Sequence, residues 1–119
     1  MPTSQKHTDL TYLRTLSNGD NGFIKEMLSL FIAQTPDILT RMTNYLNMQD
    51  WQALSSAAHK MKPSIMFVGL KEIEEDLKKV EDYSAERINT EAIAPMLARI
   101  KEICTVAVDE LKLEKELLA

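Results

Sequence analysis

The chain has 119 residues, of which 45% are hydrophobic, so it can bury the core of one compact domain but has no room for a second. Its net charge of -4, with 18 acidic and 14 basic residues interspersed, argues against DNA or RNA binding, and a lone cysteine excludes a disulfide framework or a cysteine-based zinc site. Only three Gly and four Pro interrupt residues that favour helices, which predicts an all-α protein.

The sequence carries no signal for export or membrane insertion. Its N-terminus, MPTSQKHTDL, has no apolar run typical of a signal peptide, and no segment reaches the ~20 apolar residues that a membrane span requires. Cys104 lies among apolar neighbours, which fits a reducing compartment. We therefore expect a soluble, cytoplasmic protein that does not bind membranes, and Met1 favours a free-standing chain.

The N-terminal region predicts one short helix. Residues 1–8 are expected to be flexible. Leucines at helical spacing after Asp9 indicate a helix that covers one end of the fold. The Ser-Asn-Gly sequence at 17–19 should end it, because Asn and Gly tolerate left-handed backbone geometry.

A long helix is predicted next, capped by Asp20 or Asn21. Its apolar stripe is expected to comprise Phe23, Met27, Phe31, Ile38, Met42 and Tyr45, widened by Leu28, Ile32, Leu39 and Leu46. Pro36 lacks a backbone amide, so we expect a kink near residues 32–36 rather than a break.

A helical hairpin is predicted after the polar connection at 47–50. Its first helix should bury Trp51, Leu54, Ala58, Met61, Ile65 and Val68, and Gly69 should end it. Its second helix should bury Leu70, Ile73, Leu77 and Val80 and leave Lys71, Glu72, Glu74, Glu75, Lys78 and Lys79 in solvent. The short connection makes the two helices antiparallel neighbours.

The last helix is expected after a polar link at 83–90. Its buried stripe should comprise Ile93, Leu97, Ile100, Cys104, Ala107 and Leu111, and Pro95 is tolerated only in its first turn. Four amphipathic helices with short connections predict an antiparallel four-helix bundle with a short extra N-terminal helix. We assign this bundle to residues 9–113 and expect the tail at 114–119 to be helical or frayed.

One histidine does not belong to the predicted core. At about 100° per residue, His59 lies far from the centre of its helix's apolar stripe, so it should face water. The same surface is expected to carry Ser55, Ser56, Lys62, Pro63 and Met66. A lone exposed histidine most often has no function. Lys60 and Lys62 fit either an ordinary solvated helix face or a pair of cations that would stabilise negative charge on the ring.

The hairpin geometry supplies a partner for this ring. If the hairpin is centred near Leu70, His59 lies opposite Glu81. A carboxylate that accepts a hydrogen bond from one ring nitrogen fixes the tautomer and leaves the other nitrogen free to attack phosphorus. A register shifted by one turn would make Lys78 or Asp82 the neighbour instead.

The segment AAHKMKPSIMFVGL, residues 57–70, resembles the signature of histidine-containing phosphotransfer (HPt) domains, A-H-x-L-K-G-S/A followed by a hydrophobic residue and Gly. His59 matches the phosphorylated histidine. The other matches are Lys60 and Lys62 for the basic residues, Ser64 for the small residue, Val68 to Leu70 for the closing element, and Glu81 for the family's Gln or Glu on the adjacent helix. The opening DLTYLRTLSNGDNGFIKEMLSLFIAQTPDIL is also similar to the first part of that domain, so the resemblance covers most of the chain.

Pro63 departs from this pattern, which has a small glycine one turn after the histidine. Proline deletes the amide that would bond the carbonyl of His59, and it should bend the helix below the active residue. We expect altered partner choice with activity retained.

The resemblance implies that His59 accepts a phosphoryl group from an aspartyl phosphate of one response-regulator receiver domain and passes it to another receiver domain. The implied pathway is a two-component phosphorelay that includes a hybrid sensor histidine kinase. Magnesium is expected in the receiver domain, with no cofactor intrinsic to this chain. The sequence has no GxxxxGKS or GxxxxGKT loop, so we expect a phosphocarrier without kinase activity of its own.

The resemblance also suggests how the protein docks. Receiver domains are expected to contact Ser55, Ser56, Pro63, Ser64, Met66 and Gly69. The protein is expected to be monomeric, as is common for this class of domain. The chain could also be part of a larger hybrid kinase.

Two other functions compete with phosphotransfer. In the first, the bundle is a non-catalytic adaptor that offers a groove, and His59 is incidental. In the second, the bundle binds a di-iron centre, which requires inward Glu and Glu-x-x-His motifs. Ser56 stands three residues before His59, where that motif needs Glu, so the second is not supported. The other histidine, His7, has no predicted role.

Overall fold

The computed structural model describes residues 7–118, and within them it contains helices and no strand. The helices are α1 (Thr11–Leu16), α2 (Asn21–Asn47), α3 (Trp51–Phe67), α4 (Lys71–Glu86), the 3-10 helix η1 (Thr90–Ala92) and α5 (Ile93–Leu117). Flexibility was predicted for residues 1–8, of which 1–6 lie outside the described residues, as does residue 119; His7 and Thr8 are described and are hydrogen-bonded to Glu110. The all-α fold is confirmed.

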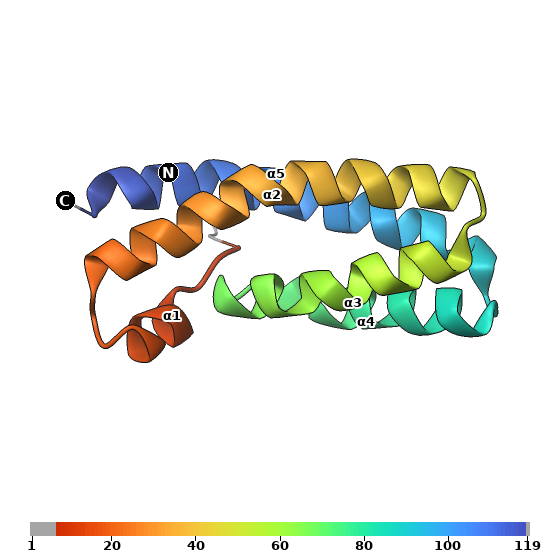
Figure 1. Ribbon diagram of the computed structural model, residues 1–119, viewed down its shortest axis with the longest axis horizontal. Helices are drawn as coiled ribbons and strands as arrows, with labels where there is room; N and C mark the ends of the chain where they lie inside the picture. Colours follow the sequence, from red (N-terminus) through yellow and green to blue (C-terminus); the bar gives the residue numbers. More distant parts are fainter. Residues whose placement is uncertain (1–6, 119) are drawn as a thin grey trace.

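The four long helices form the predicted antiparallel bundle (Figure 1). Each packs on two others, in the cyclic order α2, α3, α4, α5 and back to α2. The bundle measures 45 × 30 × 20 Å. Because α2 and α5 have 27 and 25 residues and α3 and α4 only 17 and 16, the longer pair extends beyond the shorter pair at one end, where α1 lies (Figure 1).

Side-chain caps and turns set the helix ends that the sequence predicted. The Asp20 carboxylate accepts a hydrogen bond from the Phe23 amide at 3.2 Å and so caps α2. Asp50 caps α3 in the same way, accepting from the Ala53 amide at 3.2 Å. Gly19, with φ of +78°, lies in the turn that follows α1, as expected for a residue without Cβ strain.

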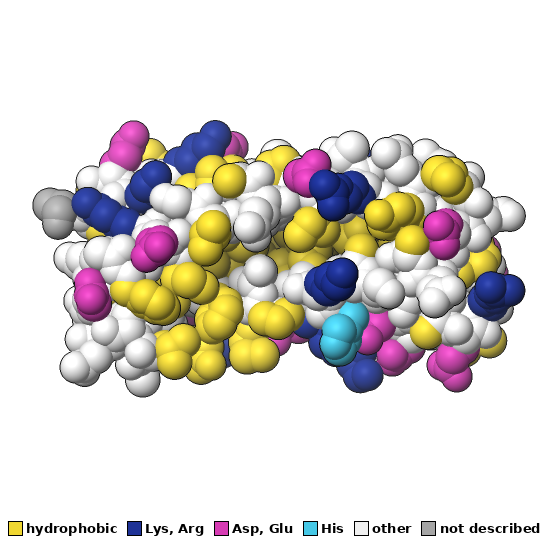
Figure 2. Space-filling model, viewed as in Figure 1, with side chains coloured by type: hydrophobic (Ala, Val, Ile, Leu, Met, Phe, Trp, Pro, Cys, Tyr) yellow, Lys and Arg dark blue, Asp and Glu magenta, His cyan; other side chains and the backbone are white. Residues whose placement is uncertain are grey.

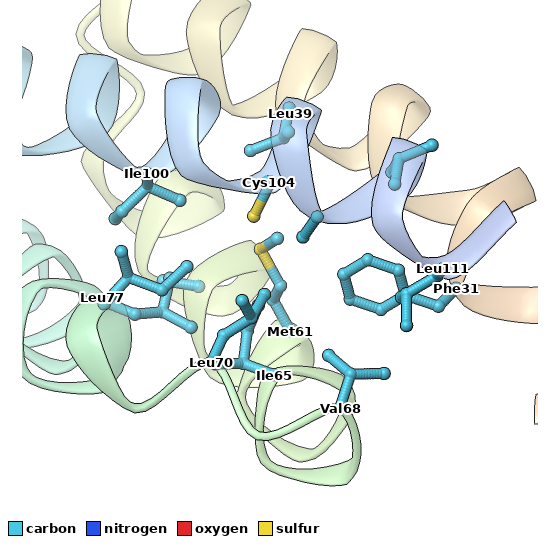
Figure 3. Packing of buried hydrophobic residues seen from close by; sticks show 14 of the residues in the cluster. Phe31, Leu39, Met61, Ile65, Val68, Leu70, Leu77, Ile100, Cys104 and Leu111 are labelled. Carbon is cyan, nitrogen blue, oxygen red and sulfur yellow. The ribbon is translucent and has the colours of Figure 1, made fainter. Parts of the chain in front are cut away.

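The core lies between the four long helices, and Figure 3 shows side chains from all of them meeting there. The stripes predicted for α4 and α5 are fully buried, and that of α3 is buried except at Trp51, which is half-buried at the start of the helix. Cys104 lies inside this core (Figure 3), and burial raises the pKa of its thiol to about 12. The thiol therefore stays protonated at neutral pH and behaves as a small hydrophobic group.

The stripe predicted for α2 was partly wrong. The residues of α2 that are buried are Ile24, Leu28, Phe31, Thr35, Leu39 and Met42. Phe23, predicted to lead the stripe, is 37% exposed, and polar Thr35 is buried. Apolar residues occupy more than one side of α2, so its own pattern does not fix its orientation, and contact with α3 and α5 selects the inward side. The helix runs through Pro36 without a break.

The prediction of a polar link at 83–90 was also wrong for residues 83–86. Helix α4 continues to Glu86, and Arg87 ends it with φ of 56°. Tyr83 packs against the core, and the Ser84 hydroxyl donates to the carbonyl of Val80 within the helix. Because the hydroxyl is satisfied internally, a serine can lie buried here and the helix does not need to stop.

A short N-terminal strap, residues 7–10, ties the overhanging end of the bundle together. The amides of His7 and Thr8 donate to the Glu110 carboxylate of α5 at 3.0 and 3.1 Å. The His7 ring contacts Glu72 of α4. The strap therefore bridges two helices before α1 begins.

The strap is held at its other end by the turn between α3 and α4. The Asp9 amide donates to the Val68 carbonyl at 2.9 Å, and Gly69 adopts φ of +69° directly beneath it. A Cβ added at Gly69 would lie 2.3 Å from the Asp9 carbonyl oxygen, closer than real contacts allow. Glycine is therefore needed here both for its backbone angle and for its lack of a side chain.

Gly69→Ala is expected to lower the free energy of unfolding by at least about 2 kcal/mol, because alanine is strained at positive φ and the strap must also move. Gly19→Ala is the matched control. It has φ of +78°, but nothing lies within 4 Å of the added Cβ, so it should cost only about 1 kcal/mol. Chemical denaturation of both variants measures the difference. Equal losses would contradict a steric role for Gly69.

The C-terminal residues continue the bundle. Helix α5 extends to Leu117, and Leu118 is 7% exposed. Within the residues that the structure describes, no helix is both long and apolar enough to cross a membrane.

Candidate functional site

The His59 side chain projects from the middle of α3 into solvent, as its position on the helix predicted. Its side chain is 67% exposed, whereas its neighbour Ala58 is completely buried. The ring is therefore open to a macromolecule while the helix that carries it is fixed in the core. Figure 2 shows a histidine on the open face of the bundle, with Lys and Arg side chains beside it.

The predicted contact between His59 and Glu81 is present. The imidazole Nδ1 lies 2.8 Å from Oε2 of Glu81, which comes from the antiparallel neighbour α4. Lys62 donates from its ammonium to the other carboxylate oxygen, Oε1, at 3.0 Å. The alternative neighbours are engaged elsewhere, because Lys78 and Asp82 pair with each other at 3.1 Å.

The environment of Glu81 keeps its carboxylate ionised. Its side chain is 19% exposed, and burial by itself would raise the pKa. Hydrogen bonds from Lys62 and His59 outweigh burial and hold the pKa of Glu81 below its ordinary value of 4.5. An ionised carboxylate accepts hydrogen bonds only, so Nδ1 of His59 carries a proton. In the neutral ring the lone pair is then on Nε2.

This lowered pKa predicts how stability depends on pH. A carboxylate with a depressed folded-state pKa adds stability that is complete above its unfolded-state pKa and is lost as pH falls through the folded-state pKa. The difference in unfolding free energy between the native protein and Glu81→Gln should therefore shrink as pH falls below 4.5. Urea titrations of both proteins from pH 3 to 7 measure it. A difference that stays constant down to the lowest pH would contradict this interpretation.

The other predicted site residues fall into three groups. Ser56, Lys60, Pro63 and Met66 are exposed on the same side of α3 or next to it, and the ammonium of Lys60 has no ion-pair partner within residues 7–118. Ser55 and Ser64 are half-buried, and the hydroxyl of Ser55 donates to the backbone carbonyl of Glu81 at 3.0 Å. Gly69 lies at the far end of α3, where it shapes the turn under the strap.

An apolar face lies next to His59, and Met66 is its one residue that the sequence predicted as part of a site. It comprises Tyr12, Leu16, Phe23, Leu30 and Met66, which are 37% to 52% exposed and come from α1, α2 and α3. Figure 2 shows hydrophobic side chains gathered towards the end of the molecule where α1 lies. Tyr12 stacks on Phe67 with ring centroids 6.0 Å apart, which joins α1 to α3. The sequence signal for this face was that α2 has more apolar residues than its buried stripe contains.

A hollow of about 330 Å³ lies on the α2 side of the histidine. Arg41 and Tyr45 of α2 line it together with Ser56, Ala57 and Lys60 of α3. Arg41 pairs with Asp37 at 3.1 Å across one turn of α2. Arg41 was not a predicted site residue, because only the packing of α2 on α3 brings it near this surface.

The site has the parts of a nucleophile. Within residues 7–118 no group of three or more His, Cys, Asp or Glu side chains is placed to hold a metal ion. The site comprises an exposed imidazole, a carboxylate at its Nδ1 and a lysine beside that carboxylate. Such an arrangement can accept an electrophilic group on Nε2, the ring nitrogen that does not face Glu81.

Comparisons with known proteins identify a family for this chain and a similar protein. The model of the family described as Hpt domain matches residues 26–116, which include both His59 and Glu81. The phosphorelay intermediate protein YPD1 of Candida albicans is 26% identical over 69 residues, a region that is 58% of this chain and 38% of that protein. The chain thus covers well under two thirds of that relative. No solved structure gives a significant match.

Proposed function

Because the chain belongs to the Hpt domain family, we propose that it is a phosphotransfer protein that carries a phosphoryl group on Nε2 of His59 between receiver domains of a phosphorelay. The observation that carries the proposal is the contact between Nδ1 of His59 and Glu81, which leaves Nε2 on the open surface. The similarity to a phosphorelay intermediate protein supports the same pathway. The family and this similarity support a role in a phosphorelay, and we propose in addition that the phosphoryl group passes between receiver domains.

The chemistry requires no proton to leave the ring. The lone pair of Nε2 forms a bond to phosphorus while the bond between phosphorus and the aspartyl oxygen of the donor breaks, and the donor carboxylate is released. The ring keeps its proton on Nδ1 and gains a formal positive charge, which the Glu81 carboxylate faces at 2.8 Å. Transfer to the next aspartate is the reverse of these steps, so the same groups serve both directions.

The two lysines would act on the phosphoryl oxygens, which carry the negative charge. Lys62 approaches from the side of α4, where Glu81 holds it, and Lys60 is an exposed residue directly after His59. Positive charge near the transferred group stabilises it and attracts an acidic partner. Magnesium and the remaining stabilisation are expected from the receiver domain, so this chain acts as a phosphocarrier and needs no nucleotide site.

We place the receiver-docking surface around His59 and over the apolar face. Met66 lies seven residues after His59, about 10 Å farther along the helix axis, and links the two areas. An apolar patch rimmed by polar residues is typical of protein interfaces. Ser56, Pro63 and Met66 are exposed and fit this surface, whereas Gly69 contributes through the turn rather than through contact.

A phosphotransfer assay tests the proposal. A panel of purified receiver domains, including any encoded beside this gene, is loaded with radiolabelled phosphoryl from a small-molecule donor and mixed with the protein. Label that is acid-labile and alkali-stable, as expected of phosphohistidine, should appear on this chain and pass to a second receiver domain. If no receiver labels the chain, the adaptor function predicted as the rival would be favoured.

A further inference from the structure

Three side chains of α3 converge on one residue of α4. Ser55, His59 and Lys62 are spaced four and three residues apart, so they lie in one row on the helix. Each contacts Glu81: the serine hydroxyl at its backbone carbonyl, the imidazole at Oε2 and the ammonium at Oε1. The distances are 3.0, 2.8 and 3.0 Å. Besides the two side-chain contacts at the Glu81 carboxylate, α3 is thus joined to Glu81 by a third contact, which Ser55 makes with the main chain.

The direction of the backbone explains why serine can reach this carbonyl. Carbonyls of a helix point towards its C-terminus, while side chains lean towards its N-terminus. In the antiparallel pair, the C-terminal direction of α4 corresponds to the N-terminal direction of α3. The Glu81 carbonyl therefore points towards Ser55, one turn before His59, and its carboxylate leans towards His59 and Lys62.

A second hydroxyl lies at this carbonyl. Ser84 of the same helix shares its single hydroxyl proton between the carbonyl of Val80 and that of Glu81, the latter at 3.2 Å. The Ser84 bond lies within α4 and says nothing about the distance between the helices. The Ser55 bond is different, because it joins α3 to α4 at the residue whose carboxylate must meet His59.

We propose that Ser55 is a positioning residue for the phosphoacceptor, acting through Glu81. Its hydroxyl fixes the backbone of α4 against α3, and the carboxylate is thereby held where it keeps the proton on Nδ1 of His59. The inference extends the proposed phosphotransfer function, since the tautomer it sets is the one that leaves Nε2 free to attack. It also gives Ser55 a different role from the receiver contact that the sequence suggested, because its hydroxyl faces α4.

The tautomer of His59 measures this role directly. Protein labelled with ¹⁵N in its histidines is titrated by NMR, and the two ring nitrogens of His59 are observed at a pH where the ring is neutral. In the native protein Nδ1 should have the shift of a protonated nitrogen. In Ser55→Ala the two shifts should move towards each other, as the ring exchanges between tautomers.

A matched pair of variants separates the hydroxyl from the size of the side chain. Ser55→Thr keeps the hydroxyl and should restore the native shifts, whereas Ser55→Val has nearly the same shape without it and should behave as Ser55→Ala. Thr43→Ala is the control for loss of a hydroxyl-to-carbonyl bond, because Thr43 donates to Leu39 within α2 at 2.9 Å. It should leave the His59 shifts unchanged.

Transfer kinetics give the second readout. Ser55→Ala should slow phosphoryl transfer to His59 about fivefold, the factor that corresponds to one typical hydrogen bond, and Ser55→Thr should recover it. Unchanged His59 shifts in Ser55→Ala would overturn the proposal, even if transfer slowed, since the defect would then lie in receiver contact. Because the shifts are read without phosphorylation, they decide the role of Ser55 even if the native chain accepts no label.

Discussion

His59→Gln is expected to abolish labelling of this protein by every receiver domain. Glutamine is similar in length and polar, so it fits the exposed position on α3, but its amide nitrogen has no lone pair available to attack phosphorus. The two other side chains of α3 that contact Glu81 do not replace the imidazole, since Lys62 is held by the Glu81 carboxylate and Ser55 donates its hydroxyl to α4. Transfer of label from phosphorylated receivers, followed over time, measures the loss.

The control for this variant is His7→Gln. The sequence holds two histidines, and His7 lies in the N-terminal strap, where its ring contacts Glu72 rather than Glu81. His7→Gln should accept label at the native rate, and circular dichroism should show that both variants remain helical. Persistent acid-labile label on His59→Gln, or its loss from His7→Gln with the fold intact, would place the phosphoacceptor elsewhere.

Lys62→Glu should slow transfer on the order of tenfold to hundredfold, because it replaces a cation beside His59 with a second carboxylate next to Glu81. The incoming phosphoryl group would then approach two negative charges without the compensating ammonium. The expected change in stability is smaller, since the Lys62 side chain is 38% exposed and paired charges at such positions contribute little. Rapid-quench kinetics and urea denaturation measure the two effects separately.

Lys79→Glu is the matched control for this charge reversal. Lys79 is an exposed lysine of α4 that pairs with Glu75 at 3.4 Å, so its reversal changes the net charge equally and also breaks one ion pair. It lies two residues before Glu81, which places it on the opposite side of the helix. Transfer should stay within about twofold of native, as salt screens distant surface charges. Equal slowing by both variants would show that Lys62 acts only through the net charge of the protein.

Pro63 is the departure from the family signature that changes the backbone at this site, and α3 accommodates it. The helix runs unbroken from Trp51 to Phe67, with Pro63 exposed one turn after His59. Without an amide at this position, the carbonyl of His59 has no partner of the ordinary helical kind. Altered partner choice remains the expected consequence of this substitution.

The sequence by itself determined the fold class and the solvent-facing position of His59. The stripes of α3, α4 and α5 were predicted almost residue by residue, because each helix has one dominant apolar side. The outward direction of His59 follows from the same periodicity. Its pairing with Glu81 could be predicted because the turn at Gly69 is short, which fixes the register of the two helices that it joins.

Only the tertiary structure decided the features that depend on contact between elements. Helix α2 is apolar on more than one side, so its neighbours selected the buried face and left Phe23 on the surface. Ser84 is polar in sequence, but a hydrogen bond within α4 lets the helix continue. The hydrogen bond from Ser55 to the Glu81 carbonyl could not be predicted from the sequence, because it depends on the distance between the backbones of α3 and α4. The spacing of side chains along a helix shows which way each one points, but not how close the neighbouring helix lies.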